Sequence, residues 1–267
     1  MTELSGKTAL VTGALKGIGR GVAEVLAAAG ARIAVHGRAG DAEVHEFLEH
    51  LEALGAPQAK YFHADLRDPA QIEEMMEGVR LWGGADIIVN NAGMQATAPM
   101  AEMKRETWDQ VIAVNLSAAF DTMRLGLPVM AERGYGRVIN IASVHGLVAS
   151  KEKAPYVSSK FGIVGLTKVG ALEYARAGTK ESGGVTVNAI CPGWVETALI
   201  EPQIQARAAR HGGDRAAGIA DMLAEKQPTL RTSDPEEIGH LVLWLCSRHA
   251  HNITGAAIPV DGGWSAQ

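Results

Sequence analysis

The 267-residue chain is poor in several features that would narrow its class: it has two cysteines, 5% aromatic residues and no surplus of basic charge. Cys191 and Cys246 stand in apolar surroundings, which favours buried reduced thiols over a disulfide or a catalytic thiol. A net charge of −5 at pH 7 argues against nucleic acid as a partner. No apolar run reaches the roughly 18 residues that a membrane span needs. The first residues are too polar for a signal peptide, so we expect a cytoplasmic protein without a membrane partner.

Short β-prone runs alternate with helical patterns along the chain. The pattern predicts strands at 7–12, 32–36, 59–63, 85–90, 136–142, 185–191 and 256–260. It predicts helices near 17–29, 42–54, 69–81, 105–132, 155–176 and 235–247. This alternation is typical of a parallel sheet with helices on both faces. We therefore expect an α/β fold, a Rossmann-type doubly wound parallel sheet of about seven strands, in one domain over residues 1–267.

Residues 194–228, after the sixth predicted strand, interrupt the alternation. Their pattern is helical and amphipathic, with Gly212 and Gly213 near the middle. Ligands of doubly wound sheets bind beyond the carboxyl ends of the strands, where such an insertion would lie. We expect a helical substrate lid here. A surface excursion without a role in binding is the alternative.

A glycine-rich turn follows the first predicted strand, in the run 7–19. Gly13 would permit the tight turn, Gly17 the approach of a pyrophosphate, and Gly19 close packing of helix on strand. The following helix would offer its free N–H groups and positive dipole end to phosphates. This context predicts a dinucleotide site, and a glycine-rich connection without a ligand is the alternative.

Tyr156 and Lys160 are spaced to share one helix face, and Ser143 follows the apolar run 137–142. A phenol has a pKa of about 10, and a neighbouring ammonium lowers it toward the range that suits proton transfer. The serine hydroxyl could hold the oxygen that is oxidised or reduced. Alone, the tyrosine–lysine pair is a weak signal, because both residues are common on helix surfaces.

Together these motifs, with Asn90-Asn91-Ala92-Gly93 and Cys191-Pro192-Gly193, resemble those of the short-chain dehydrogenases/reductases over the whole chain. The resemblance implies a catalytic tetrad of Asn115, Ser143, Tyr156 and Lys160. Asn115 would lie where a helix opens to hold a water, unless it is a helix-interior amide that bonds locally. The resemblance implies cofactor contacts at Gly13, Lys16, Gly17, Ile18, Gly19, Arg38, Asp65, Leu66, Asn91, Ala92, Gly93, Pro192, Gly193, Val195 and Thr197, and no metal.

Within that family, the segments 90–95, 143–150, 191–195, 225–228 and 260–264 are similar to those of bacterial D-3-hydroxybutyrate dehydrogenases. The similarity implies a substrate site made of Gln95, His145, Lys153, Trp194 and Gln203. One fixed cation with several hydrogen-bond donors suits a small carboxylate. We therefore expect an oxidoreductase that transfers a hydride between a small 3-hydroxy acid, D-3-hydroxybutyrate giving acetoacetate, and a nicotinamide cofactor.

The choice of cofactor is open between two nucleotides. An acidic residue after the second strand selects NAD, but His36-Gly37-Arg38 has no carboxylate before Asp41. Lys16 and Arg38 could pair with a 2′-phosphate, which favours NADP. The resembled hydroxybutyrate dehydrogenases use NAD although they lack the acid, and an arginine can stack on adenine. We expect NAD, with NADP as the alternative.

The sequence also allows or disfavours several other functions. Lys16 and Arg38 would also suit an NADP-linked reductase of a 3-oxoacyl thioester or a sugar or polyol. A non-catalytic dinucleotide-binding protein is a further alternative, disfavoured because all four tetrad positions are filled. A hydrolase would need a Gly-x-Ser-x-Gly turn after a strand, which is missing. The helices predicted at 105–132 and 157–172 are apolar on more than one face. With the family resemblance, this predicts a homotetramer.

Overall fold

The computed structural model describes residues 3–266, and their strands form one parallel sheet in the order β3-β2-β1-β4-β5-β6-β7. The order reverses between β1 and β4, which confirms the predicted doubly wound, Rossmann-type α/β fold. Most of the strands are continuous apolar runs without alternation, because helices cover both faces of the sheet. The strands are β1 (Thr8–Val11), β2 (Arg32–Val35), β3 (Ala59–Tyr61), β4 (Ile87–Asn90), β5 (Tyr135–Ile141), β6 (Gly184–Pro192) and β7 (Ala257–Val260).

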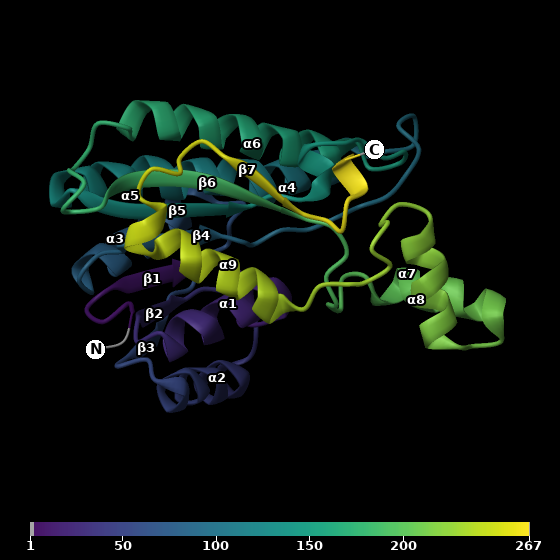
Figure 1. The fold of residues 1–267 in the computed structure, drawn as a ribbon, viewed down its shortest axis with the longest axis horizontal. Helices are drawn as coiled ribbons and strands as arrows, with labels where there is room; N and C mark the ends of the chain where they lie inside the picture. Colours follow the sequence, from purple (N-terminus) through teal and green to yellow (C-terminus); the bar gives the residue numbers. More distant parts are fainter. Residues whose placement is uncertain (1–2, 267) are drawn as a thin grey trace.

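The helices cover the sheet in two layers (Figure 1). One core cluster joins the sheet to α1 (Gly17–Ala28), α2 (Asp41–Leu54) and α9 (Pro235–Cys246). A second joins the other face to α3 (Pro69–Leu81), α5 (Ala118–Arg133) and α6 (Ala154–Tyr174). Cys191 and Cys246 are buried and free, and burial raises their thiol pKa values to about 11 and about 12. Both are therefore thiols of the interior, as predicted.

Local sequence signals account for where several helices begin and end. Asp68 caps α3 by accepting a hydrogen bond from the N–H of Ala70. Asp234 and Glu237 form a reciprocal capping box at the start of α9, with a proline at the first helical position. α5 ends at Gly134, whose φ of 68° is the left-handed conformation that glycine adopts without strain. These ends lie close to the predicted boundaries.

The helix predicted over 105–132 opens in its middle, at the position of Asn115 where the family resemblance implied an opening. α4 (Arg105–Ile112) and α5 are joined by a π-helical turn, Ala113–Ser117, so the helix is widened in its middle. The side chain of Asn115 inside this turn accepts a hydrogen bond from Met94 N at 2.8 Å and donates one to Met94 O at 2.9 Å. A widened turn is a frequent device at functional sites. Here it fastens the helix to the loop after β4.

The segment after β6 is helical, as predicted. It contains α7 (Glu201–Ala208) and α8 (Arg215–Ala224), separated by a short 3₁₀ turn and by Gly212 and Gly213, both at positive φ. The two helices pack against each other and extend beyond the body of the sheet (Figure 1). Within residues 3–266 no helix is long and apolar enough to span a membrane.

Candidate active site

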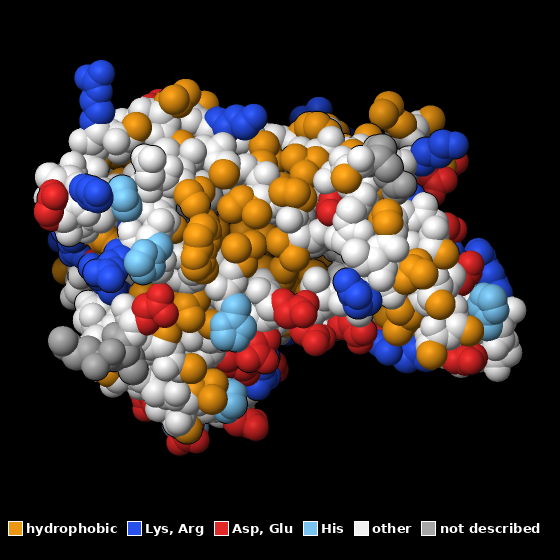
Figure 2. All heavy atoms as spheres, in the orientation of Figure 1, with side chains coloured by type: hydrophobic (Ala, Val, Ile, Leu, Met, Phe, Trp, Pro, Cys, Tyr) orange, Lys and Arg blue, Asp and Glu red, His pale blue; other side chains and the backbone are white. Residues whose placement is uncertain are grey.

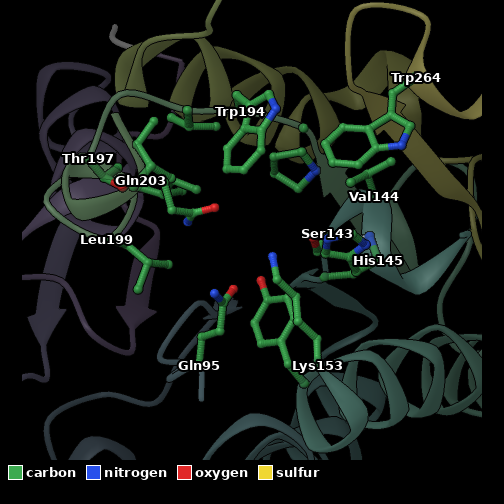
Figure 3. A pocket seen from close by; sticks show the side chains of 17 residues that line it. Gln95, Ser143, Val144, His145, Lys153, Trp194, Thr197, Leu199, Gln203 and Trp264 are labelled. Carbon is green, nitrogen blue, oxygen red and sulfur yellow. Dashed lines mark hydrogen bonds between the residues drawn. The ribbon is translucent and has the colours of Figure 1, made fainter. Parts of the chain in front are cut away.

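A pocket lies between the carboxyl ends of β5 and β6, the segment that leads into α7, and the C-terminal turn (Figure 3). The predicted site residues that line it are Ile18, Gln95, Ser143, His145, Lys153, Tyr156, Pro192, Gly193, Trp194, Val195, Thr197 and Gln203. Segments far apart in the chain are therefore brought together at one cavity, on the side of the sheet where doubly wound folds bind ligands.

Ser143 and Tyr156 lie next to each other on the inner wall of this pocket. Ser143 extends β5 and caps the turn after it, where its Oγ accepts a hydrogen bond from His145 N at 3.1 Å. Tyr156 lies in the first turn of α6. Burial raises the pKa of the Tyr156 phenol, and a hydrogen bond with Ser143 acts in the opposite direction. The phenol is therefore protonated at neutral pH in the substrate-free chain.

Lys160 is buried one turn further along α6. Its ammonium donates to Ile141 O at 2.7 Å and lies 5.7 Å from the centre of the Tyr156 ring. Burial lowers the pKa of Lys160 to about 8. From the sequence we expect this cation to lower the pKa of Tyr156, but in the substrate-free chain burial is the larger influence on the phenol and raises its pKa. The ammonium is directed at a backbone carbonyl of β5.

Asn115 reaches the same helix through Ser159. Its Nδ2 donates to Ser159 Oγ at 3.1 Å, and Ser159 in turn donates to Tyr156 O at 2.7 Å. Ser159 is fully buried. A hydrogen-bonded connection thus links the loop after β4, the π-helical turn and the first turn of α6. Sequence reasoning did not single out Ser159, because a serine before a lysine carries no distinguishing signal.

The outer part of the pocket carries a cation and two amides. The polar ends of Gln95, Lys153 and Gln203 point into the cavity in Figure 3. Burial lowers the pKa of Lys153, and the nearby charge of Lys226 adds to this. No aspartate or glutamate is among the residues that line the pocket in the described chain. The wall is therefore positively charged and rich in hydrogen-bonding groups, which suits an anion.

His145 closes one side of the pocket. Burial lowers its pKa to about 4, helped by the charges of Lys153 and Lys226, so the imidazole is neutral at pH 7. Its Nδ1 lies 3.3 Å from Val148 O, which places the single ring proton on Nδ1. In this tautomer Nε2 is an acceptor. The expected role as a donor to a carboxylate therefore requires that the ring take up a proton when the acid binds.

The glycine-rich turn has the shape that a dinucleotide requires. Gly13 and Gly17 have positive φ values of 66° and 55°. A Cβ on Gly19 would lie 2.2 Å from Gly13 O, so only glycine fits there. α1 begins directly after this turn, and its first turn holds neither a side-chain cap nor an acidic residue. Its N–H groups are thus free for phosphate oxygens, and a nicotinamide dinucleotide fits.

Polar contacts fasten this turn to its neighbours. Thr12 Oγ1 accepts hydrogen bonds from Asn91 N and Ala92 N, both at 3.0 Å, and Asn91 Nδ2 donates to Thr12 O at 2.9 Å. Across the turn, His36 accepts from Gly13 N at 3.3 Å through Nδ1, and its Nε2 lies 3.1 Å from Ala64 O. In the sequence, His36 is notable only because it stands where a carboxylate is usually found. No local pattern signals that its ring bridges Gly13 and Ala64.

The remaining predicted cofactor residues lie around this turn. A Cβ on Gly17 would lie 3.3 Å from Thr197, and one on Gly93 would lie 3.8 Å from Lys160 Nζ, so these segments converge. Lys16 and Arg38 are exposed. Leu66 is buried at a small cavity that also contacts Ala92 and Asn115. Asp65 is bound by Arg67 through two hydrogen bonds from Nε, and this partner lowers the pKa of its carboxyl.

Sequence reasoning missed part of the pocket lining. Ala142, Val144, Leu199 and Ile200 add apolar surface, and Trp264 of the C-terminal turn closes one end. The ring of Trp264 lies 5.3 Å from that of His145 and 5.8 Å from that of Trp194. Trp264 therefore belongs to the pocket lining. Apolar residues of these types are too common for a local pattern to identify them.

Comparisons with known proteins agree with this geometry. A family model described as short chain dehydrogenase matches residues 7–208. The D-beta-hydroxybutyrate dehydrogenase of Cupriavidus necator is 48% identical over 99% of this chain and 100% of its own length. That of Rhizobium meliloti is 43% identical over 98% and 99%. A solved structure from Beutenbergia cavernae, described as a candidate NAD(P)-dependent gluconate 5-dehydrogenase with NADP at low occupancy, matches with a TM-score of 0.86, 35% identity and 99% coverage of both chains.

Proposed function

The chain belongs to the short-chain dehydrogenase family and is a nicotinamide-dependent oxidoreductase acting on a secondary alcohol; we propose that its substrate is D-3-hydroxybutyrate, oxidised to acetoacetate. One observation carries the proposal. The pocket places a serine and a tyrosine on one wall and a lysine with two amides on another, with no acidic lining residue. A small molecule with a hydroxyl at one end and a carboxylate at the other matches this arrangement.

Ser143 and Tyr156 act on the oxygen at C3. Ser143 donates a hydrogen bond to this oxygen and holds it beside the phenol. In the direction of reduction, Tyr156 donates its proton to the carbonyl oxygen, and the raised pKa of the substrate-free phenol suits this role. In the direction of oxidation, Tyr156 must first lose its proton, so the oxidation rate rises with pH. Preorganised donors around the developing charge contribute most to catalysis.

Lys160 and Asn115, which are not among the lining residues of the pocket, support Ser143 and Tyr156. Lys160 provides a buried ammonium between β5 and α6 that would contact the nicotinamide ribose and help the phenol to lose its proton in the complete site. Asn115 holds the loop after β4 and, through Ser159, the first turn of α6. The π-helical turn would hold a water for proton relay. The bound nicotinamide supplies the hydride acceptor or donor.

The carboxylate of the substrate would bind between Lys153, Gln95 and Gln203, with His145 as a fourth partner once protonated. Trp194 and Trp264 would cover the apolar face of the short carbon chain. Residues 194–228 would act as a lid that brings Gln203 toward the acid and excludes water. We assign the whole chain to one catalytic domain that carries this lid.

For the cofactor we propose NAD, with contacts at the predicted residues around the glycine-rich turn. Lys16 and Arg38 are exposed and free to turn toward a 2′-phosphate, so NADP is the second candidate. The dissociation constants of the wild type for NAD and NADP distinguish them, and Arg38→Ala tests the contact with the 2′-phosphate. The affinity of this variant for NAD should change little, whereas its affinity for NADP should fall by about tenfold or more if Arg38 pairs with that phosphate. Arg80→Ala, on the exposed surface of α3, is the matched control.

We also propose that the protein is a homotetramer. α5 and α6 expose Phe120, Phe161 and Leu172, the last at 80%. A second apolar area lies over α9 and β7 in Figure 2. Trp244, a residue of α9, is 46% exposed. Two separate apolar faces suit a closed assembly built on two kinds of two-fold contact. Light scattering of Leu172→Glu should show a smaller species than the wild type, while Lys180→Glu, in the exposed segment after α6, serves as the control.

The assay that tests the proposed activity follows the absorbance of reduced nicotinamide. D- and L-3-hydroxybutyrate are each offered with NAD and with NADP. We expect turnover of the D isomer with NAD. Binding of the cofactor without turnover of either isomer would refute the substrate, leave a dehydrogenase for another alcohol, and make gluconate and 3-oxoacyl thioesters the next substrates to offer.

A further inference from the structure

Gln227 is a buried amide that lies outside the proposed chemistry. It stands between α8 and α9, at the end of the proposed lid, and is 3% exposed. Its Oε1 accepts a hydrogen bond from Trp194 N at 3.2 Å, and its Nε2 donates to Arg231 O. One side chain therefore bonds to the backbone on both sides of the lid, where the chain enters it and where it leaves.

Two glycines leave the space that this amide occupies. A Cβ on Gly193 would lie 2.8 Å from Gln227 Oε1 and 2.9 Å from Asp261 Cα. A Cβ on Gly262 would lie 2.6 Å from Gln227 Cγ. The side chain is thus enclosed between the turn after β6 and the C-terminal turn that carries Trp264. The amide therefore fills the space between the two turns, and no residue larger than glycine fits at either position.

The segments where the proposed lid begins and ends, residues 194–196 and 231–233, also bond to each other next to this amide. Ser233 N donates to Trp194 O, and Glu196 N donates to Ser233 O, both at 2.9 Å. Thr232 Oγ1 donates to Glu196 Oε1 at 2.7 Å. The two segments therefore form a short paired stretch, and Gln227 packs between it and Gly262 of the C-terminal turn, next to the hydrogen bond from Thr229 N to Gly262 O at 3.1 Å.

We propose that Gln227 is the positioning residue that sets the separation of Trp194 and Trp264, and through it the width of the substrate end of the pocket. The inference rests on the proposed function for the identity of the substrate, but its structural part stands independently. The two indoles, whose ring centres lie 5.8 Å apart, are in contact and form one apolar wall against which a short, unbranched acid packs. Displacing this wall weakens the hold on the acid, while the cofactor turn and the tetrad keep their arrangement.

Two variants test this. Gln227→Glu keeps the acceptor for Trp194 N but places an oxygen against Arg231 O, and Gln227→Met removes both hydrogen bonds. For each we expect KM for the acid to rise by about tenfold, with kcat and the dissociation constant of the cofactor changed by less than about threefold. Gln58→Glu is the matched control, because this exposed glutamine serves as an acceptor for Arg32 far from the pocket and a carboxylate preserves that bond.

A second readout is independent of the substrate. Indoles 5.8 Å apart couple strongly in circular dichroism, and the contribution of the pair is defined by comparison with Trp194→Phe. We expect this signal to fall in both Gln227 variants and to stay in Gln58→Glu. An unchanged signal in both variants, or a cofactor affinity that falls as much as the acid affinity, would overturn the proposal. If the wild type does not turn over hydroxybutyrate but the Gln227 variants lose the circular dichroism signal, the proposed substrate is refuted and the role of Gln227 is supported.

Discussion

The cofactor half and the substrate half of the site are built in different ways. Around the glycine-rich turn, most of the contacts that hold the structure involve backbone atoms, as in the bonds of Thr12 and Asn91. In the substrate half, side chains from widely separated segments meet, such as Gln95, Lys153 and Trp264. The first half depends on space and backbone direction, whereas the second depends on charge and side-chain placement. Mutations should therefore act differently in the two halves.

The largest effect is expected where the two halves meet. Tyr156→Phe removes the proton donor but keeps the ring, so turnover should fall by about a hundredfold to ten thousandfold, with cofactor affinity nearly unchanged. Steady-state rates and cofactor titration measure the two quantities. Tyr174→Phe, later in α6, is the control. A Tyr156→Phe enzyme that keeps more than a tenth of the rate would remove the tyrosine from its assigned role.

In the cofactor half, a single added methyl group should weaken cofactor binding. Gly19→Ala would place a Cβ 2.2 Å from Gly13 O, so the turn cannot keep its shape. We expect the dissociation constant for the nicotinamide cofactor to rise by about 10- to 100-fold. Gly40→Ala is the matched control, since a Cβ there meets nothing within 4 Å. Equal affinities in the two variants, measured by calorimetry, would show that this turn does not hold the cofactor.

The substrate half should respond to the loss of a charge. In Lys153→Gln we expect KM for the acid to rise by at least about tenfold, because a hydrogen bond between charged groups is lost, with the cofactor affinity unchanged. Lys151→Gln, two residues away and exposed, should behave like the wild type. If both variants bind the acid equally well, Lys153 is not a carboxylate partner.

The smallest effect is a dependence of acid binding on pH. The pKa of His145 is lowered to about 4 in the free chain, and a bound carboxylate raises it, so the complex binds more protons than the free enzyme. Acid binding should therefore tighten by a few-fold as pH falls from about 8 to 6. Calorimetry in buffers of different ionisation enthalpy measures the proton uptake. His145→Gln should abolish the uptake, and His45→Gln, exposed on α2, should preserve it. Uptake that persists in His145→Gln would assign the proton to another group.

Much of the fold could be predicted from local patterns. β1, β2 and β4 are short apolar runs whose burial on both sides requires a covered parallel sheet, and the glycine-rich turn after β1 implies the reversal of strand order. α7 and α8 were predictable from the amphipathic pattern of residues 194–228. Over 105–132 the helical pattern alone predicts one continuous helix, whereas the opening at Asn115 followed from the family resemblance and is confirmed by the π-helical turn. Asn115 bonds there to Met94 in a distant loop, and a helical pattern contains no information about such a contact.

The parallel sheet, the glycine-rich turn and the identity of the polar residues at the site follow from local sequence, since each depends on neighbours along the chain. The electrostatics and the shape of the pocket arise only in the folded molecule. Lys160 is directed at Ile141 O, His145 holds its proton on Nδ1, and Trp264 closes the cavity. These properties arise from burial and from contacts between remote segments, which become defined only when the chain has folded.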